Sequence, residues 1–414
     1  MKIAFIVSGF PKLSETFILN QITGLLDLGH EVDIFAQFNS KEGKVHQDVE
    51  TYHLMERVHY FNMPSSRLKR VLKAIYLLVV NLRKAPVAIL RSLNIFRYGK
   101  EALSLRLFYA LLAFIRRRTT YDVIHCHFGP NGIIGVFLKE SGMKGKIITS
   151  FHGYDFSAYI SQNGEGVYKD LFKKGDLFMA NSEHTKNRLI SLGCDERKIV
   201  KLPMGLDSDQ FRFRPRKLEL GQKIKILTVA RLVEKKGIEY SIKAVANVMQ
   251  KHQNIEYKIA GDGPLRKDLE RLILDLGVKD KVHLLGWLER NEVIRVMDES
   301  HIFILSSVTA KNGDQEGQGV VLQEVQAMGL PVLATLHNGI PEGVVDGRSG
   351  FLVPERDVDA LAEKLGYLIE HPEQWVEMGR FGRKFVEENY NMKKLNRKLV
   401  EIYEECLAKR KEES

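Results

Sequence analysis

Two glutamates stand eight positions apart in the stretch EGQGVVLQE, residues 316–324. Between them lie a Gly-x-Gly and an apolar run typical of a helix start, and Gly329 marks the helix end. The N–H groups of a first helical turn attract an anion, and glycine lets the anion approach closely. The stretch therefore predicts either an ordinary helix preceded by an acidic loop, or half of a binding site. In the second case Gly319, Val320 and Val321 donate backbone hydrogen bonds to a phosphate.

Two cations could complete such a phosphate site. Arg231 ends the apolar run 223–231, and Lys236 follows five residues later, near the start of the next predicted helix. If the run is a strand, both residues lie at the carboxyl edge of a sheet, where ligands bind in open α/β folds. Arginine holds phosphate oxygens through two donors and lysine acts as a point charge. The alternative is that both are surface residues beside a helix cap.

The elements that would position these residues alternate along the chain. Short apolar runs rich in β-branched residues alternate with helical patterns, which indicates α/β units on parallel sheets. We therefore predict an α/β protein with two Rossmann-like, doubly wound domains that face each other across a cleft. The expected strands are 2–9, 31–37, 121–128, 146–151 and 177–181 in the first half, and 223–231, 256–263, 281–287, 301–307 and 330–335 in the second.

A cluster of proline and glycine marks the expected join between the domains, near 202–216. We predict an N-terminal domain over 1–205 and a C-terminal, nucleotide-binding domain over 206–391. The remaining stretch, 392–414, has the pattern of a charged amphipathic helix, and we expect it to pack back on the N-terminal domain.

The composition is that of an ordinary globular protein, with 44% hydrophobic and 28% charged residues. The three cysteines are odd in number and widely spaced, which argues against a disulfide framework or a zinc knuckle and fits a reducing cytoplasm. The opening MKIAFIVSGF is too short an apolar run for a signal peptide, so we interpret it as the first strand. We expect a cytoplasmic protein.

The excess positive charge is concentrated in one segment, 65–118. This segment holds 13 of the 62 Lys and Arg residues and one of the 52 acids, so the rest of the chain is nearly balanced. Its longest uncharged runs have nine residues, whereas a membrane-spanning helix needs about 20. Two interpretations stay open: helices lying on an anionic membrane surface, or buried helices with basic edges. Nucleic acid is a weaker third interpretation, because no nucleic-acid motif accompanies the charge.

Six motifs occur in an order and spacing that is similar to a known family. They are FHGYD (151–155), LPMGLDSDQF (202–211), VARLVEKKG (229–237), AGDGPLRKDL (260–269), EGQGVVLQE (316–324) and HNGIPEGVVDGRSGFLV (337–353). Over nearly its whole length the chain resembles the retaining GT-B glycosyltransferases of family 4, which include bacterial exopolysaccharide and lipopolysaccharide transferases. The stretch 10–21, FPKLSETFILNQ, further resembles a subgroup associated with exopolysaccharide assembly.

The resemblance gives the motif residues roles. It implies that Arg231 and Lys236 bind the diphosphate of a nucleotide sugar, that Glu324 binds the ribose and that Glu316 faces the transferred sugar. It places His152 against the donor sugar near the reacting carbon, although a histidine at a strand end is more often a structural hydrogen-bonding residue. The further residues expected around the donor are Gly9, Gly286, Trp287, Leu288 and Gly317.

The acceptor side is predicted from the N-terminal loop and two motif residues. Many family members carry adjacent glycines after the first strand, whereas this chain has Ser-Gly-Phe-Pro at 8–11. The departure puts the usual backbone contact there in doubt, and the loop would instead present a polar side chain to substrate. The acceptor-side candidates are Ser14, Glu15, Thr16, His127 and Asp155.

The function that the resemblance implies is retaining transfer of a hexose from a nucleotide-diphosphate sugar to a hydroxyl of a glycan or lipid-linked acceptor. It requires no cofactor and no metal, with attack from the front face of the sugar, and we expect no nucleic-acid partner. The enzyme would be cytoplasmic or peripheral on the inner face of the membrane. The alternatives are a nucleotide-sugar epimerase or phosphorylase of the same architecture, or a non-catalytic sugar-nucleotide-binding module.

Two other site classes are disfavoured by the sequence. A dinucleotide dehydrogenase would carry G-x-G-x-x-G after the first strand, and this chain does not. The pair His125 and His127 would lie on one face of a strand, with no third metal ligand evident. The two D-x-D sequences, at 207–209 and 357–359, fall in the interdomain motif and at a helix start, where aspartate is a common cap.

Overall fold

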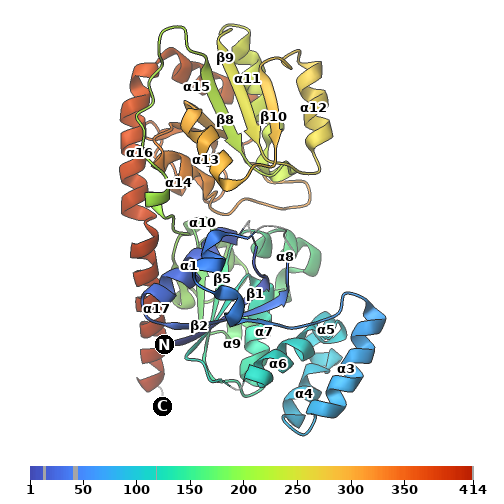
Figure 1. Ribbon diagram of the computed structural model, residues 1–414. Coiled ribbons are helices and arrows are strands. Elements are labelled where there is room, and N and C mark those ends of the chain that lie inside the picture. Colours follow the sequence, from blue (N-terminus) through green and yellow to red (C-terminus); the bar gives the residue numbers. More distant parts are fainter. Residues whose placement is uncertain (13–14, 41–44, 118, 413–414) are drawn as a thin grey trace.

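The computed structural model describes residues 1–12, 15–40, 45–117 and 119–412, and it contains two parallel β-sheets with helices on both faces (Figure 1). The seven-stranded sheet has the order β3-β2-β1-β4-β5-β6-β7 and the six-stranded sheet the order β10-β9-β8-β11-β12-β13. The predicted fold class, two doubly wound α/β domains, is confirmed.

The strands of the first sheet are β1 (Lys2–Gly9), β2 (Glu31–Phe38), β3 (Val58–Tyr60), β4 (Val123–His127), β5 (Lys146–Phe151), β6 (Leu177–Ala180) and β7 (Ile199–Lys201). Those of the second are β8 (Ile224–Val229), β9 (Ile255–Ala260), β10 (Val282–Gly286), β11 (Ile302–Leu305), β12 (Val332–Thr335) and β13 (Gly350–Val353). All ten predicted strands are present, while the short edge strands β3, β7 and β13 were not predicted.

The helices of the first half are α1 (Thr16–Asp27), α2 (Gln47–Thr51), α3 (Arg67–Asn81), α4 (Pro86–Ser92), α5 (Ile95–Leu103), α6 (Arg106–Arg117), α7 (Gly129–Glu140), α8 (Ala158–Asn163), α9 (Lys169–Lys174) and α10 (Glu183–Ser191). The second half has α11 (Ile238–Met249), α12 (Arg266–Asp275), α13 (Arg290–Glu299), α14 (Val321–Ala327), α15 (Val358–Glu370), α16 (Trp375–Asn389) and α17 (Met392–Glu412).

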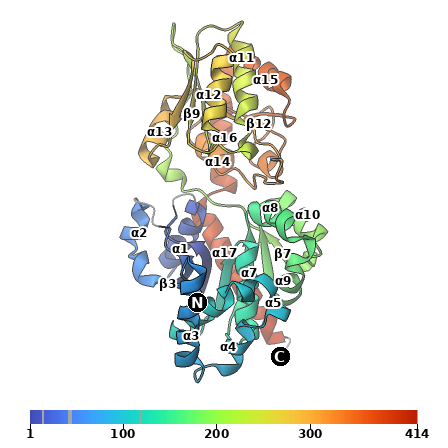
Figure 2. The same ribbon diagram turned by 90° about the vertical axis from the view of Figure 1, so that its right-hand side faces the viewer.

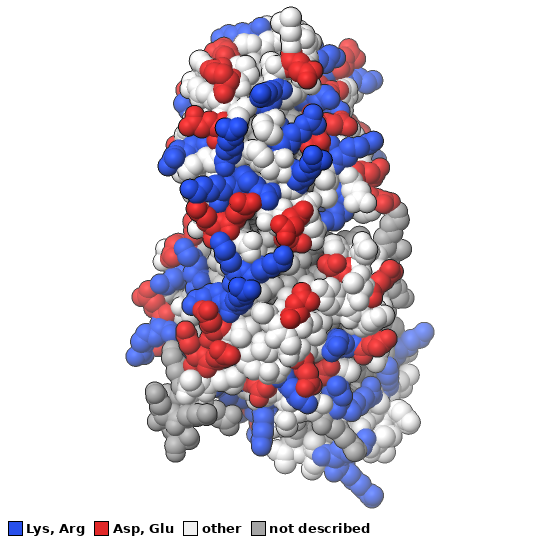
Figure 3. Space-filling model, turned by 60° about the vertical axis from the view of Figure 1, so that its left-hand side comes forward, with Lys and Arg blue, Asp and Glu red and all other residues white. Residues whose placement is uncertain are grey.

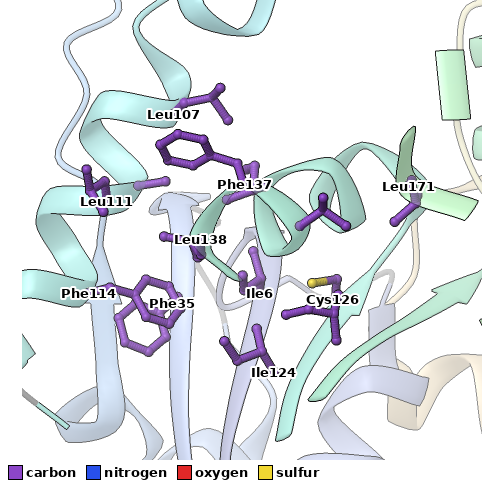
Figure 4. Close-up of a cluster of buried hydrophobic side chains, with 14 of the residues drawn as sticks. Ile6, Phe35, Leu107, Leu111, Phe114, Ile124, Cys126, Phe137, Leu138 and Leu171 are labelled. Carbon is purple, nitrogen blue, oxygen red and sulfur yellow. The ribbon is translucent and has the colours of Figure 1, made fainter. Parts of the chain in front are cut away.

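Helices cover both faces of the first sheet, so its central strands are buried almost throughout. All five residues of β4 are buried, as is usual when neither face of a parallel sheet meets water. On one face, α6 and α7 pack against the strands, and Figure 4 shows Leu111 and Phe114 beside Phe35. On the other face the core includes residues of α1 and of the C-terminal helix α17, among them Leu399 and Tyr403.

The segment 65–118 folds as α3 to α6, and its parts differ in burial. Residues 107–114 of α6 are buried in the core of the first domain, as the buried-helix interpretation expects. Helices α3, α4 and α5 form a lobe at the end of this domain that is remote from the C-terminal domain (Figures 1 and 2). Among the described residues, no helix combines the length and the hydrophobicity needed to cross a bilayer.

The chain crosses between the domains twice, and the two crossings are hydrogen-bonded to each other. Leu206 donates its N–H to the carbonyl of Tyr390 (2.8 Å) and accepts from the N–H of Met392 (2.9 Å). A Cβ on Gly205 would lie 2.9 Å from the Cα of Met392, so glycine permits this close approach. After the second crossing, α17 runs along the first domain (Figure 1), and the Tyr403 hydroxyl lies 2.6 Å from His125 Nδ1.

Candidate active site

The stretch that carries the paired glutamates is a loop that turns into helix α14 at the carboxyl edge of the second sheet. Gly319 has φ +71°, a left-handed conformation that favours glycine. Its carbonyl accepts from Leu322 N–H (2.9 Å). Within the described chain, the N–H groups of Gly319, Val320 and Val321 have no backbone or side-chain acceptor. These predicted phosphate donors are therefore available to a ligand.

Glu316 and Lys236 form a close ion pair that the sequence did not predict. Their side chains are 17% and 12% exposed. Burial alone would raise the pKa of Glu316, but the charges of Lys236 and Lys235 outweigh it and lower that pKa to about 2. Lys235 Nζ also anchors the loop by binding Asp314 Oδ1 and the Gln315 carbonyl, each at 3.1 Å. Glu316 is thus ionised at neutral pH and sits beside the cation predicted for the diphosphate.

Glu324 lies in the first turn of α14 and lines a small cavity between the domains. The cavity is lined from the N-terminal domain by Thr16 and His46 and from the C-terminal domain by Glu324 and Arg290. Burial raises the pKa of Glu324, and the positive charge of Arg290 opposes that shift. The structure thereby brings Thr16, predicted for the acceptor side, next to the residue predicted for the ribose.

The stretch 286–288, predicted to lie around the donor, opens onto a larger hollow. Gly286 ends β10 with φ +76°, and Leu288 packs on the core of the C-terminal domain. The indole of Trp287 is 56% exposed and lines a hollow of about 560 Å³ together with Arg290. Residues 45–48 of the N-terminal domain form the opposite wall, so both domains contribute to this part of the cleft.

Arg231 stands apart from this network. It follows β8, is exposed to solvent, and takes part in no ion pair with another described residue. The guanidinium, predicted to bind the diphosphate, is therefore available to a ligand.

His152 comes from the other domain, at the carboxyl end of β5, and is part of a buried histidine pair. Its Nε2 lies 3.1 Å from His127 Nδ1, and Phe17 packs against its ring at 4.6 Å. Burial lowers the pKa of His152 to about 3, so the ring is neutral at physiological pH. A Cβ on Gly317 would lie 2.3 Å from the His152 carbonyl. The loop at Gly317 in the C-terminal domain is therefore in contact with His152, at the end of β5 in the N-terminal domain.

Of the remaining acceptor-side candidates, Asp155 faces inward. It is fully buried, and its carboxylate accepts N–H groups from Gly129, His152 and Gly153 at 2.9–3.0 Å. Burial raises the pKa of Asp155, and these hydrogen bonds offset only part of that shift. In this structure the buried Asp155 carboxylate fixes the turn that carries His152.

The N-terminal loop is described only in part. Glu15 pairs with Lys12 and is nearly buried at the start of α1. A Cβ on Gly9 would lie 2.7 Å from the ring of Phe38, so Gly9 lets β1 end against a neighbouring side chain. The candidate Ser14 lies outside the described residues.

Two buried side chains that sequence reasoning missed hold the site loop in place. His337 Nε2 accepts the N–H of Glu316 at 3.0 Å, so the ring proton is on Nδ1, which lies 2.5 Å from Glu355 Oε1. Gln318 accepts the N–H of Met204 at 2.7 Å and donates to the Met204 carbonyl at 3.0 Å. The only signal for His337 was its place at the head of the motif 337–353.

The two D-x-D sequences have structural partners. The Asp207 carboxylate accepts the N–H of Asp209 (3.2 Å), and the Asp357 carboxylate caps α15 by accepting the N–H of Ala360 (2.9 Å). Both ring nitrogens of His125 are also engaged, one by Tyr403 and the other by the Ser150 hydroxyl at 2.7 Å.

Two Rossmann-like domains whose strand ends meet over a cationic and carboxylate-bearing cleft define the GT-B class of glycosyltransferases. The family model described as Glycosyltransferase Family 4 matches residues 14–210, and the model described as Glycosyl transferases group 1 matches residues 209–385. The chain belongs to glycosyltransferase family 4, and it is a glycosyltransferase.

Two relatives are similar over nearly their full length. WcaL of Salmonella typhimurium, whose name assigns it to colanic acid biosynthesis, is 36% identical over 407 residues, covering 97% of this chain and 99% of its own. The amylovoran biosynthesis glycosyltransferase AmsK of Erwinia amylovora is also 36% identical over 407 residues, covering 98% of this chain and 99% of its own. Among solved structures, Anabaena HepE in complex with UDP and glucose superposes with a TM-score of 0.72 at 18% identity, over 98% of this chain and 100% of its own.

Proposed function

We propose that this glycosyltransferase moves a hexose, with retention of anomeric configuration, from a nucleotide-diphosphate sugar to a hydroxyl of a glycan or lipid-linked acceptor in exopolysaccharide synthesis. The observation that carries the proposal is the order of groups along one loop and helix: Glu316 beside Lys236, then the donors of 319–321, then Glu324. A nucleotide-diphosphate sugar presents hydroxyls, phosphates and ribose in this same order. The names of two relatives support the polysaccharide context.

In the proposed mechanism the protein supplies position and electrostatics. Lys236, Arg231 and the backbone donors would offset the charge that grows on the leaving diphosphate, which is the largest source of catalysis in such transfers. The neutral ring of His152 would hydrogen-bond the donor sugar, since at a pKa of about 3 it carries no charge at neutral pH. Contact between the domains at Gly317 and His152 would exclude water, the competing acceptor.

We propose that no metal is needed, because lysine, arginine and backbone N–H groups can neutralise the diphosphate together. Transfer in the presence of a chelator would then match transfer without it. A rate restored only by added divalent cation would contradict this part of the proposal.

The test of the function is acceptor-dependent release of nucleoside diphosphate. A thermal-shift screen over nucleotide sugars would first identify the donor, and the anomeric configuration of the product would follow from its NMR coupling constants. Release of a free monophosphosugar would favour a phosphorylase, and interconversion of nucleotide sugars without acceptor would favour an epimerase. Binding without turnover on any polysaccharide-type acceptor would favour a non-catalytic module.

An acceptor that is carried on a lipid would place the enzyme at the inner face of the cytoplasmic membrane, as the basic segment 65–118 suggested. This localisation is part of the proposal.

A further inference from the structure

Helix α3 has two apolar faces, and only one of them is covered by protein. Ala74, Leu77 and Asn81 lie on the buried face. On the opposite side Leu68 and Val79 face solvent, and the side chain of Val79 is 74% exposed. The other exposed apolar side chains of this helix are Val71, Leu72, Ile75, Tyr76 and Val80. A surface helix that faces only water would carry polar residues there, so this face is built to be covered by something.

The neighbouring helices extend the same exposed apolar surface. Helix α4 exposes Val87 and Leu90, and α5 exposes Ile95 and Leu103. Phe96 is 98% exposed, which is extreme for an aromatic side chain. We refer to the exposed apolar side chains of α3, α4 and α5 as the lobe surface.

The charges around the lobe surface are predominantly positive. Residues 67–103 contain nine Lys and Arg residues and one acid, Glu101, whose carboxylate lies 3.1 Å from Arg106 Nη1. The described residues place no carboxylate within salt-bridge distance of eight of these cations, the exception being Arg97, which pairs with Glu140. On a helical wheel of α3, Lys73 lies at one edge of the exposed apolar face and Lys69 lies near that edge, while Arg83 follows the last residue of the helix. The molecular face seen in Figure 3 interleaves acids and bases instead.

We propose that the lobe surface binds the headgroup region of an anionic lipid bilayer, with α3 lying in the plane of the membrane. Charge complementarity decides the occupant, because an apolar face with a predominantly cationic rim fits acyl chains below anionic headgroups. A second copy of this chain would have to place two cationic rims against each other, which opposes self-association.

The position of the lobe adds a constraint on the acceptor, and this step rests on the proposed function. The lobe lies at the end of the N-terminal domain remote from the C-terminal domain (Figures 1 and 2). A bilayer on the lobe therefore leaves the N-terminal domain between the lipid and the cleft. A lipid-linked acceptor must then carry its reactive hydroxyl on a glycan long enough to pass the domain, so the enzyme extends a chain rather than glycosylating the lipid itself.

The test is flotation of the full chain with vesicles of phosphatidylcholine, alone or mixed with phosphatidylglycerol, at low and high salt. We expect binding to the anionic vesicles that weakens with salt. Replacing two cations, K69Q with R83Q, should weaken it about 30-fold at about 1 kcal/mol per cation. The matched control K267Q with K384Q changes exposed lysines of the C-terminal domain.

Insertion is tested separately with tryptophan. Emission from F96W should shift to shorter wavelength on anionic vesicles, whereas L220W, at a fully exposed leucine of the C-terminal domain, should not shift. Absence of vesicle binding by the wild type, or equal loss in the control pair, would overturn the proposal. So would a dimer that V79S with F96S dissociates, because the lobe surface would then be a protein interface.

Activity measurements separate this inference from the function. V79S with F96S should lower transfer to a long lipid-linked acceptor in vesicles and leave transfer to a soluble acceptor unchanged. A lipid carrying one sugar that is glycosylated as fast as the long acceptor would overturn the constraint on acceptor length. If no acceptor is glycosylated, the proposed function fails. The flotation assay still shows whether the lobe surface binds an anionic bilayer.

Discussion

The ion pair between Lys236 and Glu316 gives the sharpest test of the site. Replacing Lys236 by methionine keeps the length of the side chain and leaves a largely buried carboxylate without its nearest cation. The lowering of the Glu316 pKa from 4.5 to about 2 corresponds to about 3 kcal/mol of stabilisation at neutral pH, at about 1.36 kcal/mol per pH unit. Lys235 supplies part of this, so we expect K236M to cost about 2 kcal/mol.

The measurement is a double-mutant cycle of K236M, E316Q and the double variant in urea. Both tryptophans, Trp287 and Trp375, lie in the C-terminal domain with the pair, so their fluorescence reports the unfolding of that domain. The coupling free energy should be about 2 kcal/mol. The control K243M breaks an exposed pair with Glu239 on α11 and should cost about 0.3 kcal/mol.

The pH dependence follows from the same pKa. A carboxylate whose pKa is lowered in the folded state stabilises the protein above its ordinary pKa of 4.5, and this stabilisation is lost as the pH falls toward about 2. Wild-type stability should therefore fall more steeply than that of E316Q over this window. Additive single substitutions, or equal slopes for wild type and E316Q, would refute the argument that the pair is a strong buried interaction.

Three further outcomes are expected. R231A should lower donor turnover by at least ~10²-fold if its guanidinium stabilises the leaving diphosphate, with K243A as the control; a near-normal rate with bound donor would contradict that role. E324A should weaken binding of the free nucleoside diphosphate in a titration, whereas E316A should spare it and impair only the nucleotide sugar; equal weakening by both would show that they do not divide the ligand. G205V should lower the free energy of unfolding by about 1–3 kcal/mol, because its side chain would meet the backbone of the paired crossing; an unchanged thermal midpoint would show that the crossings can separate at little cost.

The sequence predicted those parts of the site that depend on local pattern. The spacing of EGQGVVLQE indicated a loop, a glycine turn and a helix start, and the structure has all three at 316–324. The long strands were recognisable because their apolar runs are rich in β-branched residues, which is typical of strands buried on both faces of a parallel sheet. The three-residue strands β3 and β7 lack that length, and only their position at the sheet edge makes them strands.

The parts that could not be predicted depend on contacts distant in sequence. Lys236 and Glu316 lie in separate motifs of the chain, and nothing local shows that they pair rather than both face ligand. The same limit hid the bond between His337 and the backbone of Glu316, and it hid the hydrogen bonds by which the buried Asp155 holds the turn at His152. For α3, both sides of the helix are apolar, so periodicity could not show which side is covered by protein.

The paired crossings, where Leu206 bonds to the backbone of Tyr390 and Met392, determine how this enzyme could be recombined with its relatives. Because α17 follows the second crossing but completes the core of the N-terminal domain, the C-terminal half of the chain is not a transferable unit. A chimaera that exchanges donor specificity must join the sequences at two points, near 206 and near 391, so that each N-terminal domain keeps its own last helix. A single splice near 206 would pair α17 of one parent with the α1 surface of the other, where Leu399, Ile402 and Tyr403 are buried.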